Sequence, residues 1–259
     1  MERSDRRAEA AQLVRVVAVA AGLVLSALVV APASGQQGRP VAPVPPGHAT
    51  AGRTGAVHVS VSLVDERGAV EPAGDAVVWL EGALSGAPLV KGKAAAQVAQ
   101  RHKTFEPHVE VLRVGSTVAF PNLDRIYHNV FSLSEIAPFD LGLYRNGASR
   151  SLVFPRPGIV RIYCNIHPGM AAFLVVVNSD AFGKTGADGN VELHEVPVGT
   201  WPVSGWHEKG GDGQAQVTVV AGHTTWVELR LDSSRWRPSP HKNKYGKDYP
   251  PPDDDENRY

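Results

Sequence analysis

Cysteine is almost absent from this chain of 259 residues, which contains only Cys164 and, besides the initiator, one methionine, Met170. Without a second cysteine the chain cannot form an internal disulfide. An excess of charge of one sign is also lacking, because 26 basic and 26 acidic residues leave no net charge. The composition is that of an ordinary globular protein and does not favour nucleic acid as a partner.

A hydrophobic run long enough to cross a membrane is missing as well. The basic residues Arg3, Arg6 and Arg7 precede the apolar run 16–30, and small residues follow at 31–35. The run is shorter than the roughly 20 residues of a transmembrane helix, and the layout is typical of a secretory signal peptide. We therefore expect residues 1–35 to be a signal peptide, with an uncleaved anchor as the alternative. No cysteine follows the run closely, which excludes lipoprotein processing.

The pattern beyond the signal segment predicts an all-β protein located in the bacterial periplasm or secreted, without a membrane span after cleavage. Residues 36–55 are rich in proline, glycine and alanine and are expected to be a disordered linker. The polar tail 233–259 is expected to be largely disordered. Between them, short apolar stretches separated by turn residues predict strands, with no convincing helix. These strands are expected near 57–63, 77–80, 109–114, 118–120, 130–131, 152–154, 159–163, 173–177, 191–196, 201–206, 214–220 and 225–231.

The single cysteine needs an explanation in an exported protein, where cysteines are usually paired in disulfides. Cys164 is an intermolecular partner, a buried inert thiol or a metal ligand. The residues around it decide among these. His167 and Met170 follow at intervals of three, in a loop between two expected strands. A thiolate, two imidazoles and a weak axial thioether are the ligands of blue-copper sites, so the loop favours one type 1 copper ion.

A second imidazole has to come from elsewhere in the chain. His128 is the best candidate, because a polar loop gives way there to an apolar strand; His102 and His108 are the alternatives. The metal ligands are therefore expected to be His128, Cys164, His167 and Met170. The least specific of these is Met170, because an axial ligand can also be a glutamine or a carbonyl and the methionine could simply pack in the core.

The spacing of these residues resembles the cupredoxins, which are Greek-key β-sandwiches. The short loop is most similar to that of amicyanin, and the resemblance covers about residues 96–178. Earlier elements agree with plastocyanin-like proteins: Phe105-Glu106-Pro107, Val114-Gly115, Phe120-Pro121-Asn122 and His128-Asn129. The resemblance implies that Asn129 ties the two ligand loops together.

A closer resemblance is to exported plastocyanin-like proteins of the methylamine utilisation protein type. It is carried by Cys164-Asn165-Ile166-His167, by Phe120-Pro121-Asn122 and by Trp206-His207. Some of these relatives have an aromatic residue before the methionine, where this chain has Gly169, so the surface around His167, on which the choice of partner depends, is expected to differ.

The flanking segments resemble a different module, the carboxypeptidase regulatory-like β-sandwich. Residues 56–83 are similar to its first part and residues 179–232, with Asp188-Gly189, to its second. We therefore expect the cupredoxin domain, 84–178, to be inserted into a split sandwich, since insertions are tolerated where the two ends of an exposed loop lie close together. The alternative assigns residues 57–80 to the copper domain and places the second small sandwich after it.

These features together predict a non-enzymatic electron carrier. His167 is the expected exit toward a redox partner, a cytochrome or a dehydrogenase, at an apolar surface around Pro168. A copper carrier or buffer with the same ligands is one alternative, and a binding module with a structural copper site is another. The group Trp206-His207-Glu208 is interpreted as structural, and no nucleophile with a base is visible.

Overall fold

A computed structural model describes residues 53–83, 95–238 and 241–249 of the chain. These residues form strands and turns and no helix, which confirms the predicted all-β class. In particular, the described part of the chain has no helix long and apolar enough to span a membrane. The predicted signal peptide, linker residues 36–52, residues 84–94 and tail residues 239–240 and 250–259 lie outside the described residues.

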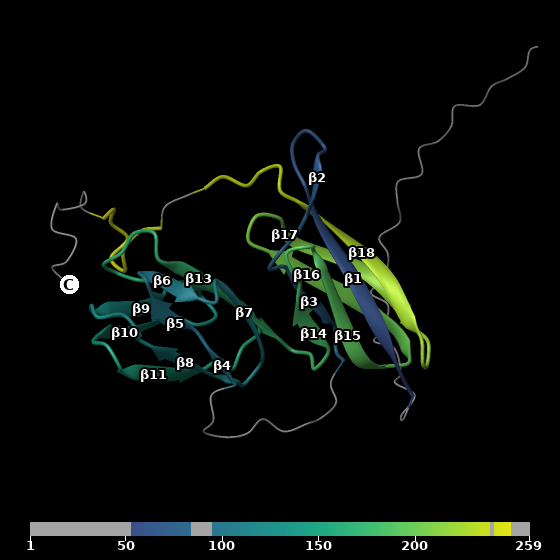
Figure 1. The fold of residues 1–259 in the computed structure, drawn as a ribbon, viewed down its shortest axis with the longest axis horizontal. Coiled ribbons are helices and arrows are strands. Elements are labelled where there is room, and N and C mark those ends of the chain that lie inside the picture. The colour runs from purple at the N-terminus through teal and green to yellow at the C-terminus, as the bar shows by residue number, and fades with distance from the viewer. Residues whose placement is uncertain (1–52, 84–94, 239–240, 250–259) are drawn as a thin grey trace, which may run out of the picture. The chain divides into compact units, whose positions relative to one another are not determined.

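One sandwich is built from the middle of the chain (Figure 1). Its larger sheet has the strand order β10-β9-β12-β13-β7, its smaller sheet has the order β11-β8-β4, and β5 pairs with β6. The strands are β4 (Ala96–Gln97), β5 (Ala99–Arg101), β6 (Thr104–Glu106), β7 (Val109–Arg113), β8 (Thr117–Pro121), β9 (His128–Ser132), β10 (Phe139–Tyr144), β11 (Ser149–Val153), β12 (Gly158–Tyr163) and β13 (Ala171–Val177).

The core of this sandwich follows from side chains that alternate between the two faces of each strand. On β8, Val118 and Phe120 are buried while their neighbours are only half-buried. On β12, Val160 and Ile162 are buried in the same way, and all four belong to one apolar cluster. This cluster also contains Cys164 and Met170, so the two sulfur-bearing side chains are part of a packed core.

The flanking segments form a second sandwich. Its sheets have the orders β15-β1-β18, with β2 beside β1, and β14-β3-β16-β17. The strands are β1 (Thr54–Val64), β2 (Val70–Pro72), β3 (Val77–Leu80), β14 (Phe182–Lys184), β15 (Asn190–Pro197), β16 (Gly199–His207), β17 (Gly211–Val219) and β18 (Thr224–Asp232). The strands that precede the middle sandwich therefore pair with strands that follow it.

Among the described strands, the partners of β1 and β3 belong to the flanking segments. β1 pairs with β15 and, in parallel, with β18, while β3 pairs with β14 and β16. Among the described strands, neither β1 nor β3 pairs with any of β4 to β13. The insertion of the cupredoxin domain into a split sandwich stays a prediction.

Both faces of strand β13 are packed against apolar side chains. It lies between β12 and β7 in the larger sheet, and almost every side chain on it is buried. Leu174 points into the core that contains Cys164, whereas Phe173 and Val175 belong to another apolar cluster with Val77 and Trp206 of the second sandwich. The strand that follows the ligand loop is therefore packed from two sides, which restrains the end of that loop.

Several short elements differ from the predicted pattern. β2, β4, β5, β6 and β14 span only two or three residues, too few for a hydrophobic period to be visible. Strand β1 begins at Thr54, inside the predicted linker.

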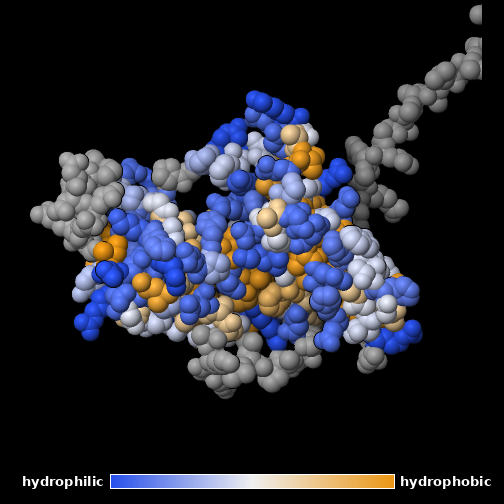
Figure 2. All heavy atoms as spheres, in the orientation of Figure 1, coloured by the Kyte–Doolittle hydropathy of each residue, from blue (hydrophilic) through white to orange (hydrophobic). Residues whose placement is uncertain are grey.

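Figure 2 shows a largely hydrophilic face with scattered apolar residues, as is usual for a protein surface.

Candidate metal centre

Two neighbouring strands bring the predicted ligands together. Cys164 follows the end of β12, and His128 is the first residue of β9. These strands are antiparallel and pair Tyr163 with Phe131, so the start of β9 lies beside the residues that follow β12. Residues far apart in sequence thus meet because of strand register.

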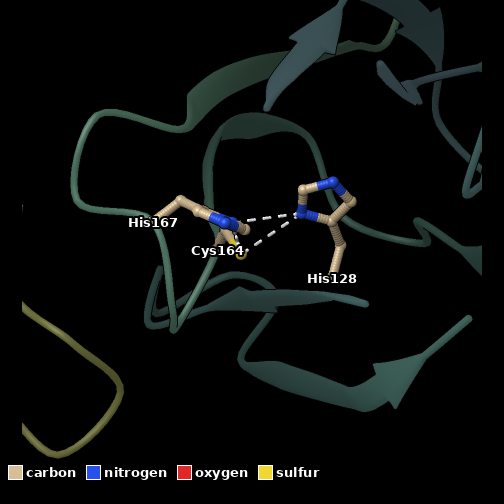
Figure 3. A group of neighbouring side chains, drawn as sticks. All are labelled: His128, Cys164 and His167. Carbon is tan, nitrogen blue, oxygen red and sulfur yellow. Dashed lines mark hydrogen bonds between the residues drawn. The ribbon is translucent and has the colours of Figure 1, made fainter. Parts of the chain in front are cut away.

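The three donor atoms lie within 4.8 Å of one another (Figure 3). Nδ1 of His128 is 3.2 Å from Nδ1 of His167, and Sγ of Cys164 is 3.5 Å from Nδ1 of His167 and 4.0 Å from Nδ1 of His128. His128 and Cys164 are fully buried, whereas His167 is half-buried. The side chains therefore converge on one point at the end of the sandwich.

The ligand loop closes on itself through its backbone. The amide of Cys164 donates to the carbonyl of Met170 over 3.1 Å, and the amide of Met170 donates to the carbonyl of His167 over 3.2 Å. Met170 is 1% exposed and shares an apolar cluster with Cys164. Its burial is compatible with core packing and with axial ligation alike.

The orientation of His128 is set by a carboxylate. Asp124 accepts a hydrogen bond from Nε2 of His128 over 2.7 Å. An ionised carboxylate only accepts hydrogen bonds, so the ring proton lies on Nε2 and the lone pair on Nδ1. That lone pair faces Cys164 and His167 (Figure 3). Such a hydrogen bond on the far nitrogen is the usual way in which a metal-binding histidine is oriented.

Asp124 is itself held in place. The backbone amides of His102 and Lys103 donate to its two oxygens over 2.6 and 2.9 Å. Burial raises the pKa of Asp124, but the hydrogen bonds from the Lys103 backbone and from His128 outweigh it and leave the pKa lowered. The group is therefore ionised at neutral pH and can fix the ring of His128.

Burial keeps the two imidazoles neutral. It is the largest cause that lowers the pKa of His128, against an opposing contribution from Asp124. Burial, followed by repulsion from the charged form of His128, lowers the pKa of His167 to about 4. Neutral rings are the form of histidine that binds a metal.

The pKa of the Cys164 thiol is set by opposing effects. Burial raises its pKa, while hydrogen bonds from the backbone of Asn129, Ile166 and His167 lower it. The metal-free cysteine is therefore a protonated thiol that already has backbone donors aimed at its sulfur. Binding a metal there must release this proton, after which the same donors stabilise the thiolate.

The donor set fits a small, soft transition-metal ion. Nitrogen and sulfur donors that bond one ion at about 2.0–2.3 Å in a plane lie roughly 3.5 Å apart. The three observed separations, 3.2, 3.5 and 4.0 Å, bracket that value. A thiolate with two imidazoles in a plane is the equatorial set of a mononuclear copper site, so the residues fit the predicted ion.

The two alternative histidines, His102 and His108, lie outside the cluster of donor atoms. His102 is exposed, and only its backbone amide contacts the site, through Asp124. Nε2 of His108 lies 2.6 Å from the carboxylate of Glu208, which directly follows β16 of the second sandwich. Among the described residues, the group capable of holding a metal contains His128, Cys164 and His167.

Sequence reasoning missed Asp124. Its only signal is a carboxylate four residues before His128 in a polar loop, a spacing that means little before the loop conformation is known.

The group around Trp206 makes structural contacts: Trp206 packs on Phe173 with ring centroids 5.2 Å apart, and Glu208 forms a hydrogen bond with His108.

Fold and site together define the class: an all-β protein of two sandwiches, one of which carries a buried cluster of two imidazoles and a thiol. No protein-family model and no curated protein matches the chain.

Several solved structures are similar to part of it. A purple cupredoxin from Nitrosopumilus maritimus is 24% identical over 32% of this chain and 99% of that one, with a TM-score of 0.30. A Cu(I) form of an amicyanin variant is 22% identical over 39% of this chain and 98% of that one, with a TM-score of 0.31. A copper-containing nitrite reductase from Thermus scotoductus SA-01 is 25% identical over 36% of this chain and 24% of that one, with a TM-score of 0.32.

Proposed function

We propose that this protein binds one copper ion and carries single electrons. The observation that supports this is the convergence of His128, Cys164 and His167, two imidazoles and one thiol, within 4.8 Å at the end of a sandwich. Cys164, His128 and His167 would be the equatorial ligands and Met170 the axial one. A copper ion held there supplies a one-electron couple between Cu(I) and Cu(II).

The chain's own residues serve electron transfer by restricting movement. Asp124 fixes the ring of His128, backbone amides point at the sulfur of Cys164, and the packed strand β13 restrains the end of the loop. Ligands that stay in place in both oxidation states allow an electron to move with little rearrangement.

His167 is the proposed exit for the electron. It is the least buried of the three donors, and the next two residues, Pro168 and Gly169, are exposed. A redox protein, a cytochrome or a dehydrogenase, would dock over this surface after export of the chain to the periplasm or beyond. Burial of His128 and Cys164 favours retention of the ion over the copper-carrier alternative.

The proposal is tested by the visible spectrum of the purified protein loaded with one equivalent of Cu(II). An intense thiolate-to-copper absorption is expected, lost in Cys164→Ser and kept in His102→Gln, which changes an exposed histidine outside the cluster. Reversible reduction without loss of metal should accompany it. A fully loaded but colourless protein would contradict the proposal, and ready transfer of Cu(I) to an acceptor would favour the carrier.

A further inference from the structure

The segment 241–249, part of the tail expected to be largely disordered, is ordered in the structure and lies against the ligand loop. The hydroxyl of Tyr249 donates to the carbonyl of Cys164 over 2.6 Å. The backbone amide of Lys244 donates to Oδ1 of Asn165 over 2.9 Å. Two consecutive loop residues, one of them the cysteine, are thus held from outside the sandwich.

The same segment is linked, through Asp140 on β10, to the other ligand-bearing strand, β9. Nζ of Lys244 lies 2.7 Å from Oδ2 of Asp140 on β10, and Oδ1 of Asp140 accepts a hydrogen bond from Nδ2 of Asn129 over 2.7 Å. Asn129 follows His128 in β9, and its backbone donates toward the sulfur of Cys164. A chain of contacts therefore runs from Lys244 to the strand that carries the second imidazole.

Aromatic contacts fix where the segment sits. The ring of His241 stacks on Tyr163, the residue before Cys164, with centroids 4.3 Å apart and planes at 23°. The ring of Tyr249 meets His241 edge-on, with centroids 5.2 Å apart. Between them Asn243 closes a turn, because its side chain accepts from the backbone amides of Tyr245 and Lys247. The segment is a defined loop with its own internal bonds.

We propose that residues 241–249 form a clamp that positions the two ligand-bearing segments of the metal site, with Tyr249 and Lys244 as its positioning residues. The clamp rests on the proposed copper function. A metal site needs its ligands held within about 0.5 Å, and a short loop with few internal bonds cannot supply that precision alone. Tyr249 restrains the loop at Cys164, and Lys244 connects that loop to Asp140 and through it to Asn129.

The first test measures how fast the full-length, Cu(I)-loaded protein loses its ion to an excess of a colorimetric Cu(I) chelator. The variants are Tyr249→Phe, Lys244→Met and the double variant. Matched controls from the same segment are Lys247→Met, whose side chain is exposed, and Lys242→Met, whose charge pairs with Asp248 at the surface. Loss of both bonds should accelerate release on the order of tenfold, each single variant less, and the controls should stay near the parent rate.

The second test needs no metal. Deuterium exchange of the peptide 162–172 is followed in the copper-free protein, where the double variant should exchange faster than the parent and the controls should not. Deuterium exchange tests the clamp independently of copper. A parent protein that never develops a thiolate-to-copper band would contradict only the proposed function. Unchanged exchange in the double variant would overturn the clamp. Faster exchange with unchanged copper release and an unchanged copper spectrum would also overturn it, because the segment would then be structural alone.

Discussion

Asp124 accepts a hydrogen bond from Nε2 of His128 over 2.7 Å, on the far side of the ring from the nitrogen that faces Cys164. The carboxylate thereby determines which nitrogen of a buried histidine is free to bind a metal. This relationship couples a surface loop to the chemistry of the site, and it leads to the first of four predictions.

Asp124→Asn should weaken copper binding about 10- to 100-fold, because an amide can donate as well as accept and no longer fixes the ring proton of His128 on Nε2. Competition titration with a chelator of known affinity measures the change. Asp212→Asn, which alters an exposed carboxylate on β17, is the control and should leave the affinity unchanged. Equal affinities for Asp124→Asn and the parent would show that the hydrogen bond does not orient the ligand.

Met170→Leu separates axial ligation from core packing. The substitution nearly conserves volume at a position that is 1% exposed, so the free energy of unfolding should change by less than about 1.5 kcal/mol. If the thioether is a ligand, its loss removes a donor that favours Cu(II), and the reduction potential should rise on the order of 60 mV, about a decade in a one-electron equilibrium. Voltammetry measures the potential. An unchanged potential would mean that Met170 only packs.

The pair of His108 and Glu208 predicts a pH-dependent contribution to stability. The hydrogen bond to Glu208 raises the pKa of His108 although burial opposes it, and the same bond lowers the pKa of Glu208. The histidine contributes stability below its ordinary pKa of 6.5, and this is lost as the pH rises through its raised value. The glutamate contributes stability above its ordinary pKa of 4.5, and this is lost as the pH falls.

The stability difference between the parent and Glu208→Gln should therefore be largest between pH 4.5 and 6.5 and shrink toward pH 8. The two side chains are 46% and 33% exposed, so solvent screening limits the difference to under about 1 kcal/mol. Urea unfolding at several pH values measures it. Glu228→Gln, in an exposed pair with Arg230, is the control and should show no such dependence from pH 5 to 8. A flat profile for Glu208→Gln as well would refute the assignment.

Two glycines with similar backbone angles provide a test of the second sandwich. Gly189 has φ +76° in the turn before β15, and a Cβ there would lie 2.5 Å from the carbonyl oxygen of Val61 in β1. Gly68 has φ +78° and open space around it. Gly189→Ala should destabilise the protein by about 3 kcal/mol, the sum of left-handed strain and displaced backbone, and Gly68→Ala by roughly 1–2 kcal/mol. Thermal unfolding measures both changes in stability. Equal losses of stability would show that the turn at Gly189 does not lie against β1.

Part of the site could be predicted because it is local. Cys164, His167 and Met170 lie in one short loop, so their spacing alone limits how far apart the side chains can be. His128 could be proposed because few histidines precede a buried strand. The hydrogen-bond partners Asp124, Asp140 and Tyr249 could not, since each depends on how a loop or tail folds, even where the two bonded residues are only a few positions apart in sequence.

The strands, too, include some that could be predicted from the sequence and some that could not. Alternating apolar residues were enough to predict the long elements, such as β1 with its buried Val57, Val59 and Val61. β10 was missed although Phe139, Leu141 and Leu143 alternate there, so the signal was present in the sequence. The two- and three-residue strands carry no period at all and exist only because a neighbouring strand supplies their hydrogen bonds.

The amino-acid sequence by itself determined that the chain is built of strands and that a thiol, an imidazole and a thioether share one loop, because period and spacing are local properties. Only the tertiary structure decided which histidine meets that loop, which nitrogen it presents and which distant residues hold the two segments together. Those features depend on strand register and on hydrogen bonds between residues up to 85 positions apart. Contacts at such separations are set by the packing of the whole chain.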